Sequence, residues 1–251
     1  MRKGIFSLFF GLLLLITYQT GLHAQSPQLL FESANKDYLE GRYDSAIEKY
    51  QQILDRDFIS GEVHFNLGNA YYKKNAFGRA ILHYERAKRF LGNDEALERN
   101  LKLARIHIVD KIEPVPQLFL IEWWHFLLNM ISIEAYAWLG VAVFFVFSLF
   151  VALEILYRGY FKKMIWTTGM IFIFVLIVFL SNVYISESTA YGIIIDQNVS
   201  IVSEPAEEGN ELFILHEGTK VLIERVSGEW YEIRLADGKT GWLKSGSLEI
   251  I

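Results

Sequence analysis

The chain alternates between amphipathic stretches and long apolar runs. Between residues 27 and 113, small and aromatic residues recur at helical spacing, which predicts a series of short amphipathic helices. Two runs, at 135–153 and 164–186, contain no charged side chain. Beyond residue 190, short apolar runs separated by Gly-containing turns predict β-strands. The pattern therefore divides the chain into a helical part, a membrane part and a β part.

The first 24 residues have the three regions of a secretory signal peptide. Arg2 and Lys3 precede an apolar run at 5–16, and a more polar stretch leads to Ala24. We expect cleavage after Ala24. A retained anchor is the alternative, because the uncharged run at 4–22 is long enough to span a bilayer. In either case the part that follows is exported.

An internal repeat with a period of about 34 residues organises the region 27–113. Small and aromatic residues occupy its fixed positions, in Gly41-x-Tyr43-x-x-Ala46-Ile47-x-x-Tyr50 and again in Asn75-x-Phe77-x-x-Ala80-Ile81-x-x-Tyr84. A third copy, recognisable at Asn100, stops after one helix because Pro114 and Pro116 would break a second. The pattern resembles the tetratricopeptide repeat, a pair of antiparallel helices. That resemblance implies two repeats, at about 27–60 and 61–94, and a capping helix.

In the tetratricopeptide family, the first helices of the repeats line a peptide-binding groove. The residues that would line it here are Phe31, Asn35, Tyr38, Phe65, Asn69 and Tyr72. The Asn side chains could hydrogen-bond the main chain of an extended peptide, while the aromatic rings supply contact area. The alternative is that the Tyr rings are packing residues and the Asn side chains are solvated. Carboxylate-binding members have Lys where Phe31 and Phe65 stand, so we expect no capture of a C-terminal carboxylate.

Both long apolar runs can cross a hydrocarbon core of about 30 Å at about 1.5 Å per residue. They predict transmembrane helices at 134–157 and 164–186. The connection at 158–163 contains Arg158, Lys162 and Lys163, and a short basic loop stays in the cytoplasm. The helical and β parts are therefore expected on the outer side. The spans lack paired acidic and basic residues at mid-depth, which argues against a transporter or channel.

A Trp-rich stretch at 114–133 precedes the first span. It is apolar but interrupted by Glu122, His125 and Asn129, and the pair Trp123-Trp124 favours the headgroup zone of a membrane. We expect an interfacial helix leading into the span. A docking face for a partner protein is the alternative.

The segment 190–251 is expected to be all β. Predicted strands occupy 199–202, 212–215, 221–226, 230–235 and 241–243, with turns at Gly218, Gly228 and Gly238. The spacing of these turns from Trp230 and Trp242 resembles the bacterial SH3 family and implies a small SH3-like barrel. Trp230, Tyr231 and Trp242 form a candidate surface for a cell-wall glycopeptide or a partner protein. Packing inside the barrel is the alternative for the two Trp residues.

Composition removes several functional classes. The 251 residues include no Cys, which excludes disulfides and thiolate chemistry, and the net charge of −5 gives no reason to expect nucleic-acid binding. There is no Gly-rich phosphate loop, nucleophile elbow or zinc-protease helix motif. We therefore expect no enzyme, cofactor or metal site. Residues 184–251 carry 5 basic and 12 acidic side chains, net −7, which favours a basic protein partner over an anionic wall polymer.

The expected order is a multidomain membrane protein with an α-helical repeat array, two transmembrane helices and a C-terminal SH3-like barrel. This order resembles the BatE-type proteins of bacterial aerotolerance operons. The resemblance implies a non-catalytic inner-membrane scaffold in aerotolerance or envelope stress, with both soluble domains in the periplasm. Its partners would be sister membrane proteins with von Willebrand A domains and an associated MoxR-type ATPase. The alternative is a peptidoglycan-binding module that acts through the SH3 domain.

Overall fold

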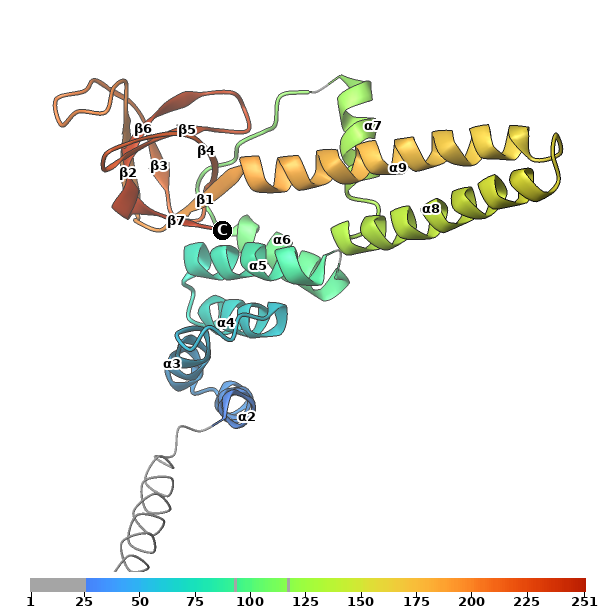
Figure 1. The fold of residues 1–251 in the computed structure, drawn as a ribbon. Coiled ribbons are helices and arrows are strands. Elements are labelled where there is room, and N and C mark those ends of the chain that lie inside the picture. Colours follow the sequence, from blue (N-terminus) through green and yellow to red (C-terminus); the bar gives the residue numbers. More distant parts are fainter. Residues whose placement is uncertain (1–25, 93, 117) are drawn as a thin grey trace, which may run out of the picture.

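The computed structural model describes residues 26–251, except residues 93 and 117 (Figure 1). The signal peptide expected at 1–24 lies outside the described residues. The chain forms a helical array, then a long helical hairpin, then an antiparallel sheet.

The helical array consists of α2 (Pro27–Leu39), α3 (Tyr43–Leu54), α4 (Gly61–Lys73), α5 (Phe77–Leu91) and α6 (Glu95–Ile106). Its repeat is visible in the caps, because the side chains of Ser26, Ser60 and Asp94 accept the hydrogen bonds that begin α2, α4 and α6. The turns repeat as well. Gly41 and Asn75, which follow α2 and α4, have φ angles of 78° and 59°. The predicted helices are thus confirmed, and the third copy ends after one helix as expected.

Small residues allow the helices of this array to approach closely. Ala34, Ala46 and Ala80 are fully buried. A Cβ atom added to Gly68 would lie 2.7 Å from two ring carbons of Tyr84, so only glycine fits between α4 and α5 at this point. The core of the array continues through Leu67, Ile81, Leu97 and Leu101, all at most 1% exposed.

The hairpin consists of α8 (Ile133–Leu156) and α9 (Lys162–Ser188), preceded by the short helix α7 (Phe119–Leu128). α8 and α9 are long and apolar enough to cross a membrane by length and composition. Glu154 closes the turn between them, because its carboxylate accepts hydrogen bonds from the main-chain N–H groups of Gly159 at 2.7 Å and Phe161 at 2.8 Å. The two predicted long apolar helices are confirmed.

The sheet contains β1 (Ala190–Ile194), β2 (Asn198–Val202), β3 (Glu211–His216), β4 (Lys220–Ser227), β5 (Trp230–Arg234), β6 (Thr240–Lys244) and β7 (Leu248–Ile250). Its order is β3-β2-β6-β5-β4-β1-β7, and the paired strands are antiparallel. The five predicted strands are present, while β1 and β7 were not predicted.

The prediction of a closed barrel for this segment is wrong, although the segment is all β as expected. No pairing joins the edge strands β3 and β7 among the described residues, so the sheet is open. The β2–β3 hairpin is attached to the other strands through a single register pair, Val202 with Trp242. Because only one residue pair joins β2 to β6, the β2–β3 hairpin does not reach β7, and the sheet does not close.

The sheet also packs against the helical array, which the sequence did not predict. Ile193 of β1 belongs to the hydrophobic core of the array. The carboxylate of Glu85, 5% exposed, pairs with Arg105 of α6 and with Lys220 of β4, whose Nζ is 2.8 Å away. Gly78 of α5 and Gly218 of the β3–β4 turn bring their backbones into contact, since a Cβ on Gly78 would lie 3.1 Å from the nitrogen of Gly218.

The linker, residues 107–116, runs along the sheet. Asp110 accepts hydrogen bonds from the main-chain nitrogen of His216 at 2.8 Å and from the hydroxyl of Thr219 at 2.6 Å. Ile112 packs against the core of the sheet, and the nitrogen of Val115 donates to the carbonyl oxygen of Ala236. The segments before and after the hairpin are therefore held by the same sheet.

Candidate functional site

The six residues expected to line a groove lie on α2 and α4. Phe31, Asn35 and Tyr38 share one face of α2 by their helical spacing, and Phe65, Asn69 and Tyr72 repeat it on α4. All six side chains are half-buried. We call this set the aromatic face. The structure thus places the six residues at equivalent positions on neighbouring helices of the array.

The two Asn residues of the aromatic face are tied into the array by their side-chain oxygens. Asn35 Oδ1 accepts from the hydroxyl of Tyr50 at 2.5 Å and from Nδ2 of Asn66 at 3.0 Å. Asn69 Oδ1 accepts in the same way from Tyr84 and Asn100, both at 2.8 Å. We call these bonds the asparagine ladder. The sequence reasoning missed Asn66 and Asn100 as ladder residues, although they stand one repeat period apart and that period could have revealed them.

Only the side-chain oxygens of Asn35 and Asn69 take part in the asparagine ladder. Within the described part of the chain, the Nδ2 groups of Asn35 and Asn69 donate no hydrogen bond, so each retains a donor for a ligand. Burial raises the pKa of Tyr50 and of Tyr84, which keeps both hydroxyls protonated as donors to the ladder.

The aromatic rings of this face rest on rings of the second helices. The centroids of Phe31 and Tyr50 are 6.0 Å apart, and the same distance separates Phe65 from Tyr84. Tyr72 lies edge-on to Phe77, 5.6 Å away. Each ring is therefore fixed from below while part of its surface stays exposed. These rings therefore pack against the second helices and are also partly exposed to solvent, so a packing role does not exclude contact with a ligand.

The aromatic face continues onto α6. The positions one repeat period after Phe65, Asn69 and Tyr72 are occupied by Arg99, Leu103 and Ile106. Leu103 is 48% exposed and Ile106 is 62% exposed. The sequence analysis did not include Leu103 and Ile106, although the repeat period points to them. The surface therefore covers three helices and ends in an apolar patch beside one basic side chain.

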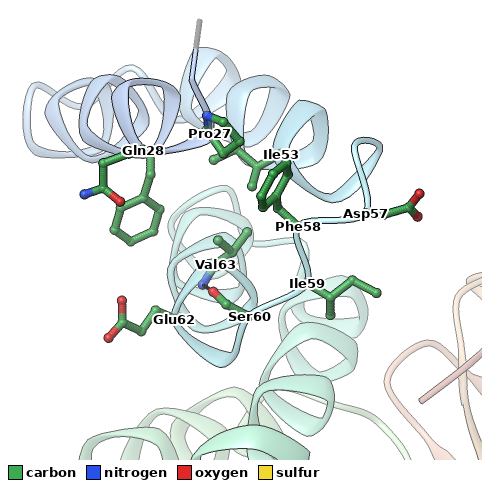
Figure 2. Close-up of a pocket in the computed structure, with 10 residues that line it drawn as sticks. Pro27, Gln28, Ile53, Asp57, Phe58, Ile59, Ser60, Glu62 and Val63 are labelled. Atoms are coloured by element: carbon green, nitrogen blue, oxygen red, sulfur yellow. Dashed lines mark hydrogen bonds between the residues drawn. The ribbon is translucent and has the colours of Figure 1, made fainter.

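A shallow pocket of about 330 Å³ opens at the other end of this surface (Figure 2). It lies between the start of α2, the end of α3 and the start of α4. Its lining combines apolar and polar side chains: Pro27, Gln28, Phe31, Ile53, Asp57, Phe58, Ile59, Ser60, Glu62 and Val63. Phe31 belongs to both the pocket and the aromatic face, so the two are continuous.

The three candidate residues of the sheet do not form one surface. Tyr231 packs against the hydrophobic core of the sheet. Trp230 and Trp242 lie on the opposite face, and each ring is approached by a cation: Lys244 Nζ is 5.8 Å from the Trp230 centroid, and the Arg225 guanidinium carbon is 5.6 Å from that of Trp242. The alternation of side chains along a strand explains the separation of Tyr231 from Trp230.

Buried charged and titratable groups in the array have protein partners. The carboxylate of Asp37 interacts with Arg42, Ser45 and Lys49, and the hydrogen bond from Lys49 is the main cause that lowers the pKa of Asp37. His64 and His83 share one hydrogen bond through their Nδ1 atoms, 3.1 Å apart. Among the described residues, no three His, Asp or Glu side chains gather in a way that could hold a metal ion.

Replacing Asn69 by alanine is expected to lower the free energy of unfolding by about 1–3 kcal/mol, because the buried hydroxyl of Tyr84 would lose its acceptor. Chemical unfolding of the purified full chain, followed by circular dichroism, measures this. Asn100→Ala removes only a donor to the same oxygen from a half-buried position and serves as the control. An equal loss in both variants would contradict a central role for the Asn69 oxygen.

The polar and aromatic groups of the aromatic face are therefore fixed by the helices beneath them. Its amide donors and partly exposed rings can contact an extended or helical segment. Comparison of the chain with protein-family models and with curated proteins finds no match.

Proposed function

We propose that the protein is a non-catalytic, membrane-anchored adaptor that binds a segment of a partner protein on the aromatic face. The observation that carries the proposal is the recurrence of the aromatic face on α2 and α4 and its continuation at the equivalent positions of α6. Half-buried aromatic side chains of α2 and α4 and exposed aliphatic side chains of α6 lie there beside the asparagine ladder. Such a surface needs little ordering when it binds, which favours affinity.

The aromatic face offers three kinds of contact. The pocket that contains Phe31 and Phe58 can take an apolar side chain of the partner. The amides of Asn35 and Asn69 can donate to the partner's main chain, and Arg99 at the far end can pair with an acidic group. A segment with an apolar residue at one end and an acidic residue at the other fits this arrangement.

The wider proposal combines the structure with the family resemblance. In it, α2–α6 are tetratricopeptide repeats with a cap, α8 and α9 are transmembrane helices, and the sheet is an SH3-like domain. The basic turn at 158–163 faces the cytoplasm, and both soluble parts lie in the periplasm of an inner-membrane protein. The partners are then the von Willebrand A-domain membrane proteins of a Bat-type complex. Two long apolar helices between two polar regions support this topology.

Two observations favour the aromatic face over the sheet as the binding site. Trp230 and Trp242 already interact with Lys244 and Arg225, so their ring faces are not free platforms for a glycan. Region 184–251 carries a net charge of −7, which repels anionic wall polymers.

Site-specific photo-crosslinking tests the proposal. A photoreactive phenylalanine analogue replaces Phe65 or Tyr72 in the full chain, and membranes from the producing bacterium are irradiated. We expect adducts with a membrane protein from both positions and none from Tyr191, an exposed aromatic residue of the sheet. In addition, Phe65→Ala with Tyr72→Ala should weaken partner capture about tenfold or more, because buried aromatic anchors dominate such interfaces. No adduct at either position 65 or position 72 would refute the proposal.

A further inference from the structure

Helix α7 presents large apolar side chains that no other part of the described chain covers. Phe119 is 75% exposed, Trp123 is 53% exposed and Phe126 is 64% exposed. A contiguous apolar surface of this kind on a ten-residue helix is unfavourable in water and marks a contact with another apolar phase.

The side chains of α7 are sorted into three faces at about 100° per residue. One face packs on the hairpin and contains Trp124 and the buried Leu128. A second face is polar, with Glu122 and His125, both exposed. The third face contains Phe119, Trp123 and Phe126. On the helical wheel, the apolar and polar faces adjoin each other on the side away from the hairpin. Glu122 lies at their border, one turn from Phe119 and Phe126, and His125 lies farther than Glu122 from the three apolar residues.

The position of α7 along α9 is fixed by hydrogen bonds at its C-terminal end. Asn182 of α9 donates from Nδ2 to the carbonyl oxygen of Leu128 at 2.6 Å, and the hydroxyl of Tyr136 donates to that of Leu127. α7 runs across α9 in the half of α9 that leads to the sheet (Figure 1). Such a crossing places α7 in the membrane plane if α9 follows the membrane normal.

The depth of this anchor agrees with the thickness of a bilayer. α9 begins at Lys162, beside the basic turn, and Asn182 lies near its other end. At about 1.5 Å per residue, the helix rises about 30 Å between these two residues, which is the thickness of a hydrocarbon core. With the basic turn at one boundary, α7 therefore lies at the opposite boundary.

We propose that α7 is a membrane-surface helix that binds the lipid headgroup layer of the outer leaflet through Phe119, Trp123 and Phe126, with Glu122 at the border of this face and His125 in water. The inference rests on the proposed membrane anchoring by α8 and α9. Lipid fits better than a protein partner because this face continues the exposed apolar surface of the hairpin, and because Trp prefers the headgroup zone.

The arrangement would orient the whole soluble part. The linker is fixed to the sheet as far as Val115, and α7 begins at Phe119. At the other end of the hairpin, β1 begins two residues after α9. The helical array and the sheet, packed on each other, are thus joined to the membrane hairpin through two short connections. A helix held in the lipid surface restricts rotation of this unit about α9.

Site-directed spin labelling tests the inference, and the chain has no Cys that would interfere. Single variants F119C, W123C and F126C are compared with H125C in the full chain, reconstituted into phosphatidylcholine–phosphatidylglycerol vesicles. We expect the first three nitroxides to show several-fold higher accessibility to oxygen, relative to a water-soluble nickel chelate, than the fourth.

Two control positions separate the possible failures. The variant I173C in the middle of α9 should report the deepest lipid, and S200C on β2 should report water. If I173C reports water, the proposed membrane anchoring itself fails. If I173C reports lipid while positions 119, 123 and 126 report water, only the α7 proposal is overturned. Shielding of these three positions from both reagents would show that protein covers them, which also overturns the proposal.

Discussion

Replacing Gly218 by alanine is expected to detach the sheet from the helical array. Gly218 has a φ angle of 87°, in the left-handed region, and a Cβ there would lie 2.5 Å from Cγ2 of Ile108 and 3.1 Å from Cδ1 of Ile81. The left-handed backbone costs about 1 kcal/mol and the overpacking a further 1–3 kcal/mol. Because both contacts belong to the interface, the loss falls on docking rather than on the core of either part.

Hydrogen exchange of the full chain in detergent micelles measures this effect. In Gly218→Ala, amides near the start of α5 and in the linker should exchange faster, by about tenfold or more for a loss above 1.4 kcal/mol. Gly228→Ala is the matched control, because Gly228 also has a positive φ of 60° but nothing within 4 Å of the added Cβ. Equal changes in the linker for both variants would show that this contact does not hold the interface.

Acidification is expected to open the α4–α5 pair. His64 and His83 are each 6% exposed, and their Nδ1 atoms share one hydrogen bond, which is lost when both Nδ1 atoms carry a proton. Tyr71 stacks on His83, and Phe90 stacks on His64. Burial, followed by the charge of Arg86, lowers the pKa of His64 to about 4, and burial lowers that of His83 as well. Arg79 adds a further positive charge near His83.

The sign of the pH effect follows from proton binding. The unfolded histidines bind protons near pH 6.5, whereas folded His64 resists protonation down to about pH 4 and the pKa of folded His83 is also lowered. The stabilisation is therefore fully present above pH 6.5 and is lost as the pH falls from 6.5 towards 4. Carboxylates with lowered pKa values, such as Asp37, lose their contribution below about pH 4, so the two effects separate.

The measurement is local unfolding of α4 and α5 by hydrogen exchange at pH 7 and pH 5, corrected for intrinsic exchange rates. We expect stability to fall with a slope of up to two protons. The double variant His64→Phe, His83→Phe replaces both partners by apolar rings and should remove this slope, while His107→Gln, at an exposed position, should retain it. An unchanged slope in the double variant would refute the assignment.

The helices could be predicted because their signals are local. Small residues at helical spacing and the uncharged runs both lie within the segments that they specify. The strands β1 and β7 were missed because five and three residues carry too little alternation, and because β1 follows α9 after two residues. The open edge of the sheet depends on pairing between distant strands, which no single segment reveals.

In the candidate site, too, local features could be predicted from the sequence and contacts between distant segments could not. Helical spacing was enough to place Phe31, Asn35 and Tyr38 on one face. It could not show that the oxygen of Asn35 is taken by Tyr50 and Asn66, since that requires the packing of three helices. Nor could it show the docking of the sheet, because Lys220 is 135 residues from Glu85. In the sheet, strand alternation alone would have separated Tyr231 from Trp230.

The contact between the linker and the sheet imposes an order on folding. During synthesis of the chain, Asp110 precedes His216 by 106 residues, and α8 and α9 lie between them. The helical array can form early, since its contacts are local, but Glu85 has no Lys220 and the core lacks Ile193 until the last strands are complete. During that interval the nascent array holds an incompletely paired buried carboxylate and an uncovered apolar edge. Maturation of the binding surface is thus coupled to completion of the chain, and a repeat array cut out on its own would remain in the early state.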